Sequence, residues 1–316
     1  MFIQILILIF GLALLGIGAE ALVSGSSRLA LRLGIAPIFI GLTIFSFGTS
    51  APELAVSMEA ALNGSSAIAL SNIVGSNIAN IGLILGITVM LAPTRIVTQL
   101  IRMQMPILIV VSISLWLLLI DGEIGLTDGI LLSLGLIVFV VVSYRAADPQ
   151  QASTEIVLPE VSKNPALSKL PVNIAFIIGG LALLIVGSQL FVESAITLAQ
   201  LFGVSEVFIG LTIVAVGTSL PEFATSVLAA LRKQPDIAVG NIVGSNVFNI
   251  LGILGVTAIV TPISALDISV VDLAAMLLFA IALLPLARSG YILSRIKGFI
   301  LLATYVAYIA YLGAGL

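Results

Sequence analysis

Two short stretches of the sequence place a proline and a glutamate side by side in apolar surroundings. The first, GTSAPELAVS, begins at Gly48, and the second, GTSLPEFATS, begins at Gly217. A proline removes one helix hydrogen bond, and its ring clashes with the carbonyl group four residues earlier, so each stretch should leave backbone oxygens without a helical partner. Glu53 and Glu222 add one carboxylate to each stretch. Because carbonyl and carboxylate oxygens both bind hard cations, the two stretches indicate a cation site.

A stripe of polar residues follows each stretch. Three residues spaced four apart share one face of a helix, and this pattern occurs twice, at Asn72, Ser76 and Asn80 and again at Asn241, Ser245 and Asn249. The hydroxyl-bearing residues beside the prolines are Thr49, Ser50, Thr218 and Ser219. These side chains offer oxygen, which suits Ca²⁺ and is also accepted by Na⁺. The chain has no cysteine and no histidine, so the usual soft ligands of transition metals are absent.

The composition places these residues in a membrane. Hydrophobic residues make up 60% of the chain, charged residues only 9%, and the mean hydropathy is +1.29, whereas soluble domains carry about 25% charged residues. A helix needs about 20 apolar residues to cross a bilayer. The sequence predicts an all-α polytopic protein with ten transmembrane helices, at 2–24, 36–60, 68–90, 104–120, 125–144, 172–192, 205–230, 238–260, 269–287 and 297–314.

The basic residues predict how these spans are oriented. All twelve Lys and Arg residues fall after odd-numbered spans. The charged residues of the loops on the opposite side are all acidic. By the positive-inside rule, both termini should lie outside the cytoplasm. The polar segment 146–171 is then a cytoplasmic linker between residues 1–145 and residues 172–316. The first span lacks a basic leader and is too long for a signal peptide, so we assign it to the mature fold.

The two halves of the sequence are copies at a constant offset of 169 residues. GTS at 48–50 recurs at 217–219, and NIVGSN at 72–77 recurs at 241–246. Because each half has five predicted spans, the second copy should enter the membrane in the opposite direction. Two inverted five-helix repeats are typical of secondary transporters, whose substrate sites lie near the bilayer midplane.

Position along the spans separates the acidic residues by expected role. A carboxylate at the centre of a bilayer costs about 2.5–3.5 kcal/mol even on the mildest scale, so Glu53 and Glu222 are interpreted as functional. No Lys or Arg lies on their spans to pair with them. Glu20, whose counterpart is Gln189, falls toward the cytoplasmic end of the first span and is interpreted as an interfacial residue.

Two inverted copies of G-T-S-x-P-E followed by N-I-V-G-S-N resemble the repeats of the sodium/calcium exchanger family, within the cation/calcium antiporter superfamily. The resemblance covers the whole chain. It implies one central Ca²⁺ site with flanking Na⁺ sites, and sliding of the first and sixth spans as a pair. Carried over by position, the metal ligands would be the Glu53 and Glu222 carboxylates, Thr49 and Thr218 through backbone oxygens, Ser50, Ser76, Ser219, Ser245, Asn80, Asn249, and the carbonyl groups of Ser46 and Ala215.

The expected function is therefore electrogenic Na⁺/Ca²⁺ antiport by alternating access across the cell membrane. Some relatives carry Asp where this chain has Asn249, which leaves K⁺ dependence open, and Ca²⁺/H⁺ exchange is the other alternative. A channel would favour symmetric rings of ligands in a continuous pore, and an intramembrane protease would need a Ser/His pair, a metal motif or paired aspartates. We expect the lipid bilayer, Na⁺ and Ca²⁺ as partners, and no cofactor, nucleic acid or obligatory protein partner.

Overall fold

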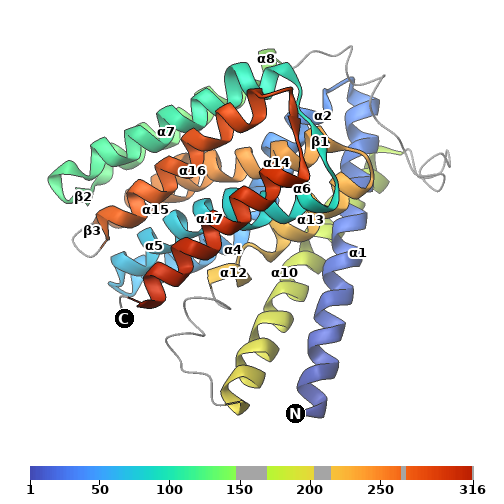
Figure 1. Ribbon diagram of the computed structural model, residues 1–316, viewed down its shortest axis with the longest axis horizontal. Coiled ribbons are helices and arrows are strands. Elements are labelled where there is room, and N and C mark those ends of the chain that lie inside the picture. The colour runs from blue at the N-terminus through green and yellow to red at the C-terminus, as the bar shows by residue number, and fades with distance from the viewer. Residues whose placement is uncertain (147–168, 203–214, 265–267, 315–316) are drawn as a thin grey trace.

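The computed structural model describes residues 1–146, 169–202, 215–264 and 268–314, and these residues are mostly helical (Figure 1). Within this part of the chain, eight helical segments are long and apolar enough to cross a membrane, and one further pair of helices is bent by 43° at a break. The protein is therefore a multi-pass membrane protein. The predicted count of ten spans stays a prediction, since the seventh predicted span, 205–230, lies partly outside the described residues.

The elements of the first half run in this order: α1 (Phe2–Leu33), α2 (Pro37–Ile40), the π-helical η1 (Gly41–Phe45), α3 (Ser46–Thr49), α4 (Ala51–Leu62), α5 (Ser66–Ala79), the π-helical η2 (Asn80–Leu85), α6 (Gly86–Leu91), β1 (Thr94–Arg95), the π-helical η3 (Leu100–Gln104), α7 (Met105–Leu118), the 3₁₀ turn η4 (Leu119–Asp121), β2 (Glu123–Ile124) and α8 (Leu126–Ala146).

The second half contains α10 (Leu170–Leu201), α12 (Ala215–Gly217), α13 (Leu220–Leu231), α14 (Pro235–Phe248), the π-helical η8 (Asn249–Leu254), α15 (Gly255–Val260), β3 (Ile263–Ser264), α16 (Val270–Arg288), β4 (Ile292–Leu293) and α17 (Arg295–Ala314). The linker predicted at 146–171 falls almost entirely outside the described residues.

Two spans form the centre of the molecule. The continuous span Ser66–Leu91 (α5, η2 and α6) is 78% buried over its apolar window, and Pro235–Val260 (α14, η8 and α15) is 89% buried. The outer helices α1, α8, α10 and α17 are only 17–28% buried over theirs, so their apolar side chains face outward to lipid. The polar stripes predicted from the sequence therefore lie on the two most buried spans.

Helices α1 and α10 form a separate pair, and their predicted ends were wrong. They pack side by side and extend beyond the rest of the bundle (Figure 1). The spans were predicted to end at residues 24 and 192, but the helices end at Leu33 and Leu201. The polar run after residue 23 suggested a loop, yet Ser26, Ser27 and Arg28 are buried in helix. Arg28 donates a hydrogen bond to Asn173 and lies over the Phe176 ring, so tertiary contacts extend the helix.

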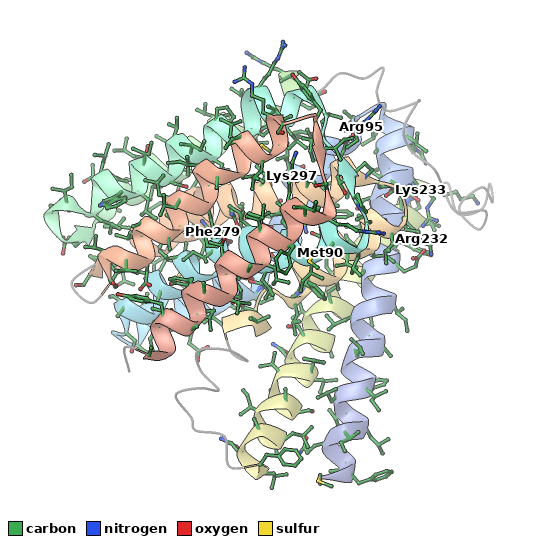
Figure 2. The ribbon with its side chains drawn as sticks, in the orientation of Figure 1. Met90, Arg95, Arg232, Lys233, Phe279 and Lys297 are labelled. Atoms are coloured by element: carbon green, nitrogen blue, oxygen red, sulfur yellow. The ribbon has the colours of Figure 1, made fainter. Side chains whose placement is uncertain are left out.

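Two very short antiparallel sheets join the halves of the chain, a departure from the all-α prediction. β1 pairs with β4, and β2 pairs with β3. The labelled basic residues Arg95, Arg232, Lys233 and Lys297 all lie on the side of the molecule away from the two termini (Figures 1 and 2). This common side agrees with the charge pattern of the sequence, while the direction in which the protein sits in the membrane stays a prediction.

Candidate cation-binding site

Two buried carboxylates lie at helix breaks in the middle of the protein. Helix α3 ends at Thr49 and α4 begins at Ala51, so Glu53 falls in the first turn of a new helix. Glu222 occupies the same position in the first turn of α13. Because the N-terminal end of a helix carries partial positive charge, it offsets part of the cost of burying each carboxylate. The prolines thus create two helix N-termini within the bundle and place one carboxylate at each.

The two carboxylates are bound reciprocally by serines of the opposite half. Ser219 donates a hydrogen bond to Glu53 Oε1 over 2.9 Å, and Ser50 donates one to Glu222 Oε1 over 2.8 Å. Both glutamates and both serines are fully buried. Ser245 Oγ also lies 3.5 Å from Glu222 Oε1. The two crossed bonds bring together four of the predicted ligands from opposite halves of the chain, and Ser245 joins them as a fifth.

Several buried oxygens of this cluster have no hydrogen-bond partner among the described residues. They are the second carboxylate oxygens of Glu53 and Glu222, the hydroxyl of Ser76, and the amide oxygens of Asn80 and Asn249. Leaving a buried polar atom unpaired costs about 1–3 kcal/mol, and more for a charged group. All five are oxygen atoms with lone pairs that can accept a hydrogen bond. Such oxygens are the ligands that a hard cation such as Ca²⁺ prefers. The donor set therefore fits a transported cation.

The remaining predicted ligands lie around this cluster. Thr49 donates to the carbonyl of Phe45 and lies 3.4 Å from Asn241 Oδ1, and Thr218 lies beside the carboxylate of Glu53. The Ser46 hydroxyl bonds the backbone, and the Ser46 carbonyl accepts from the N–H of Ser50 over 3.1 Å. Ala215 begins helix α12, and its side chain is outside the described residues.

Two asparagines that sequence reasoning missed complete the surroundings. Asn77 and Asn246 form hydrogen bonds with Asn249 and Asn80, respectively, each from the other half of the chain. Asn80 and Asn249 are also the first residues of the π-helical segments η2 and η8, a distortion frequent at functional sites. The signal available was the final asparagine of NIVGSN, which directly follows Ser76 or Ser245 and so does not share the face of the four-residue stripe.

A cavity of about 470 Å³ reaches the cluster from the face that bears the C-terminus. Its wall includes Ile68 and Asn72 of α5, Asp272 of α16, and Thr218 beside the carboxylates. Asp272 accepts a hydrogen bond from Tyr308 over 2.7 Å at this wall. The cavity therefore connects one side of the membrane protein to the residues next to Glu53.

In the other half of the chain, the residues that correspond to this cavity wall are buried. Thr49 and Asn241, the counterparts of Thr218 and Asn72, are fully buried. Ile237, the counterpart of the 57% exposed Ile68, is also fully buried. The sequence repeat is thus nearly symmetric, while the accessibility of the two halves differs.

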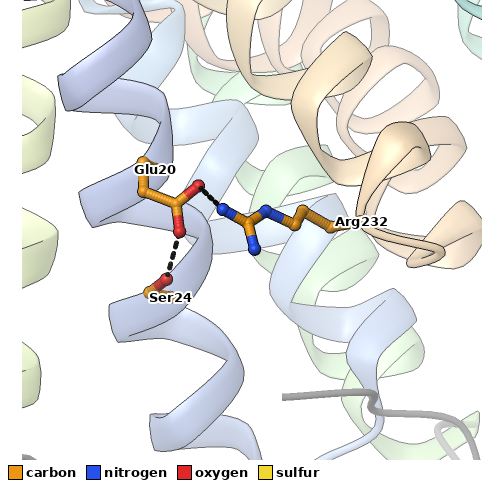
Figure 3. Close-up of polar contacts among 3 residues, drawn as sticks. All are labelled: Glu20, Ser24 and Arg232. Carbon is orange, nitrogen blue, oxygen red and sulfur yellow. Dashed lines mark hydrogen bonds and ion pairs between the residues drawn. The ribbon is translucent and has the colours of Figure 1, made fainter. Parts of the chain in front are cut away.

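Glu20 lies outside the cluster. It forms an ion pair with Arg232 at 2.7 Å, and both side chains remain more than a third exposed (Figure 3). Ser24, one turn later on α1, donates a hydrogen bond to the same carboxylate. Glu20 thus contacts a basic residue at a partly exposed position, and its interfacial role stays a prediction.

Comparison with known proteins decides the family. The sequence matches the family described as "Sodium/calcium exchanger protein" over residues 3–145 and 172–314. The chain belongs to the sodium/calcium exchanger family. This exchanger-family protein is 30% identical to "Sodium/calcium exchanger MaX1" of Methanosarcina acetivorans over 98% of both chains. It is 40% identical to "Inner membrane protein YrbG" of Escherichia coli over 81% of this chain and 79% of that protein.

A solved structure agrees with the sequence relatives. The sodium-calcium exchanger NCX_Mj, in crystals soaked with 2.5 mM Na⁺ and 0.1 mM Ca²⁺, matches this exchanger-family protein with a TM-score of 0.83 and 29% identity over 98% of both chains. The family predicted from the paired motifs is therefore confirmed. The family is one of cation/calcium antiporters, so the protein is a transporter by family.

Proposed function

We propose that the protein exchanges Na⁺ for Ca²⁺ by alternating access, with Glu53 and Glu222 as the central ligands. The observation that carries this proposal is the crossed pair of carboxylates. Each has one oxygen bound by a serine of the opposite half and one oxygen that no described residue hydrogen-bonds. The described residues provide no basic side chain bonded to either glutamate, so a cation is the natural counter-charge.

Charge balance supports exchange over leak. Two ionised carboxylates without a cation would carry a net charge of −2 through a buried passage, which is unfavourable at low dielectric constant. Ca²⁺ would neutralise the pair, and Na⁺ would bring the net charge to 0 with two ions or +1 with three. Only the loaded forms should therefore cross readily. Three Na⁺ for one Ca²⁺ would move one net charge in each cycle and make transport electrogenic.

The surrounding oxygens would divide among several ions. In this assignment Asn80 and Asn249 contribute amide oxygens at the centre, while Ser76, together with Ser50, Ser219 and Ser245, completes flanking Na⁺ sites. The backbone oxygens of Thr49, Thr218, Ser46 and Ala215 are the proposed rim ligands. The unpartnered state of the Ser76 hydroxyl and of both amide oxygens supports their place in the set.

The difference in accessibility between the halves supports two access states. The cavity beside Thr218 is open to the face bearing the C-terminus, whereas its counterpart beside Thr49 is closed. If the halves are inverted repeats, exchanging their conformations would close the first path and open the second. With both termini outside the cytoplasm, the structure would represent an outward-open state.

Helices α1 and α10 are the proposed moving unit. A Cβ atom on Gly18 would lie 2.8 Å from the carbonyl oxygen of Gly180, and one on Gly11 would lie 2.9 Å from that of Gly187. Backbones in such close contact move together more easily than apart. The exposed outer faces of both helices would slide against lipid, which offers little resistance to such a shift.

Purified protein in liposomes would test the proposed function. Ca²⁺ uptake should follow an outward Na⁺ gradient, and it should be unaffected by K⁺ and absent with a proton gradient alone. Uptake driven by protons without Na⁺ would establish Ca²⁺/H⁺ exchange instead. A strict requirement for K⁺ would establish the K⁺-dependent alternative.

The name of the Escherichia coli relative further supports placing the protein in the cell membrane.

A further inference from the structure

Four buried asparagines link the two halves beside the carboxylates. Asn77 Nδ2 donates to the main-chain oxygen of Asn246 over 3.2 Å, and Asn246 Nδ2 donates to that of Asn77 over 3.1 Å. Asn249 Nδ2 donates to Asn77 Oδ1 over 3.0 Å, and Asn80 Nδ2 donates to Asn246 Oδ1 over 2.9 Å. All four side chains are at most 1% exposed. The network is thus closed, mirrored and shielded from water.

The network fixes which way each amide points. A main-chain carbonyl can only accept a hydrogen bond, so Asn77 must turn its NH₂ group toward Asn246. The Oδ1 atom of Asn77 then faces Asn249, and because Oδ1 can only accept, Asn249 must donate from its own NH₂ group. Asn249 Oδ1 is therefore turned away from the network, and it has no partner among the described residues. The equivalent hydrogen bonds of Asn246 fix the orientation of the Asn80 amide in the same way.

We propose that Asn77 and Asn246 are positioning residues that force Asn249 and Asn80 to present oxygen, not NH₂, to the transported cation. This inference rests on the proposed function. An amide can rotate by a half turn with little change in shape, and the rotated form would direct NH₂ donors at a cation. Partners anchored on main-chain carbonyls remove that choice. The cost of ordering the ligand is met during folding and not at each binding event.

Replacing the anchor tests the inference through Ca²⁺ titration of the purified full-length protein. Asn77→Leu replaces the amide by an apolar side chain of similar size and so releases Asn249, and we expect Ca²⁺ affinity to fall at least tenfold. The matched control is Asn173→Leu, which removes a fully buried asparagine bonded to Arg28 on another helix pair. Its Ca²⁺ affinity should stay within about twofold of that of the parent. Elution profile and melting temperature report whether each variant folds.

A second substitution separates orientation from simple packing. In Asn77→Leu/Asn249→Asp, both terminal atoms at position 249 are oxygens, so no anchor is needed to select one. The added charge strengthens Ca²⁺ binding by itself, so the reference for this double variant is the single variant Asn249→Asp. We expect the loss of affinity caused by Asn77→Leu to be at least fivefold smaller in the Asn249→Asp protein than in the parent. A packing role for Asn77 predicts the same loss in both, because the cavity left by the substitution is the same.

Each outcome decides the matter. Parent-like affinity in folded Asn77→Leu would overturn the inference while leaving the proposed function intact. An equal loss from Asn77→Leu in the parent and in the Asn249→Asp protein would also overturn it, in favour of a packing role. A parent protein that binds no Ca²⁺ would overturn the proposed function and this inference with it. A tenfold loss in the parent together with a loss at least fivefold smaller in the Asn249→Asp protein would establish the positioning role.

Discussion

Replacing Glu53 by Gln should abolish Ca²⁺ binding without unfolding the protein. The substitution keeps the shape of the side chain and an oxygen that can accept the hydrogen bond from Ser219. It removes one of two negative charges that face Ca²⁺ in a fully buried site. Folding should survive because a neutral side chain is easier to bury than a carboxylate.

The expected loss can be worked out from the charges. At an effective dielectric constant of 20, two unit charges about 4 Å apart attract by about 4 kcal/mol, so a divalent cation loses about 8 kcal/mol. Part of this is recovered, because burying the second carboxylate in the empty site costs several kcal/mol. A net loss of at least ~3 kcal/mol corresponds to binding more than 100-fold weaker.

Calorimetric Ca²⁺ titration and Ca²⁺ uptake by liposomes would measure the effect. Glu59→Gln is the matched control, because it makes the same chemical change at an exposed position two turns later on α4. It should bind and transport like the parent. Glu53→Gln protein with an affinity within threefold of the parent would refute the assignment of this carboxylate to the central site.

Two further predictions concern the packing of the helix pair and the access state. Gly18→Ala should lower the melting temperature and slow transport, because its Cβ atom must move about 0.6 Å to restore an ordinary 3.4 Å contact with Gly180, and such overpacking costs about 1–3 kcal/mol. Gly16→Ala, with open space around its Cβ atom, should change neither, and equal melting temperatures would contradict the tight contact between α1 and α10. The chain has no cysteine, so single cysteines can report access. Ile68→Cys should react with an impermeant maleimide from the C-terminal face and Ile237→Cys only slowly from the basic face, whereas equal rates would contradict a single open side.

The sequence predicted the parts of this protein that depend on local chemistry. Pro52 and Pro221 were expected to interrupt their helices, and a new helix begins one residue before each of them. Spacing of four residues was enough to place Asn80 and Asn249 on buried faces. The resemblance then supplied the family, which the comparisons confirm.

The rest depends on contacts between segments that are distant in the sequence. The crossed serine–glutamate bonds join residues 172 and 166 positions apart, and no periodicity within one helix reveals them. Asn77 was missed for the same reason, since its partners all belong to the other half. The predicted C-terminal end of α1 was wrong because burial against α10 keeps polar residues in a helix that local composition would end earlier.

Obligatory exchange is the most direct test of the central claim that two buried carboxylates must be neutralised before the protein can change its access state. Liposomes containing the purified protein would be loaded with Ca²⁺ and diluted into Na⁺, Ca²⁺ or a large impermeant cation. The account predicts rapid Ca²⁺ loss into Na⁺ or Ca²⁺ and retention in the impermeant cation. Equally fast loss in all three solutions would show that ions pass without exchange, and it would contradict the account.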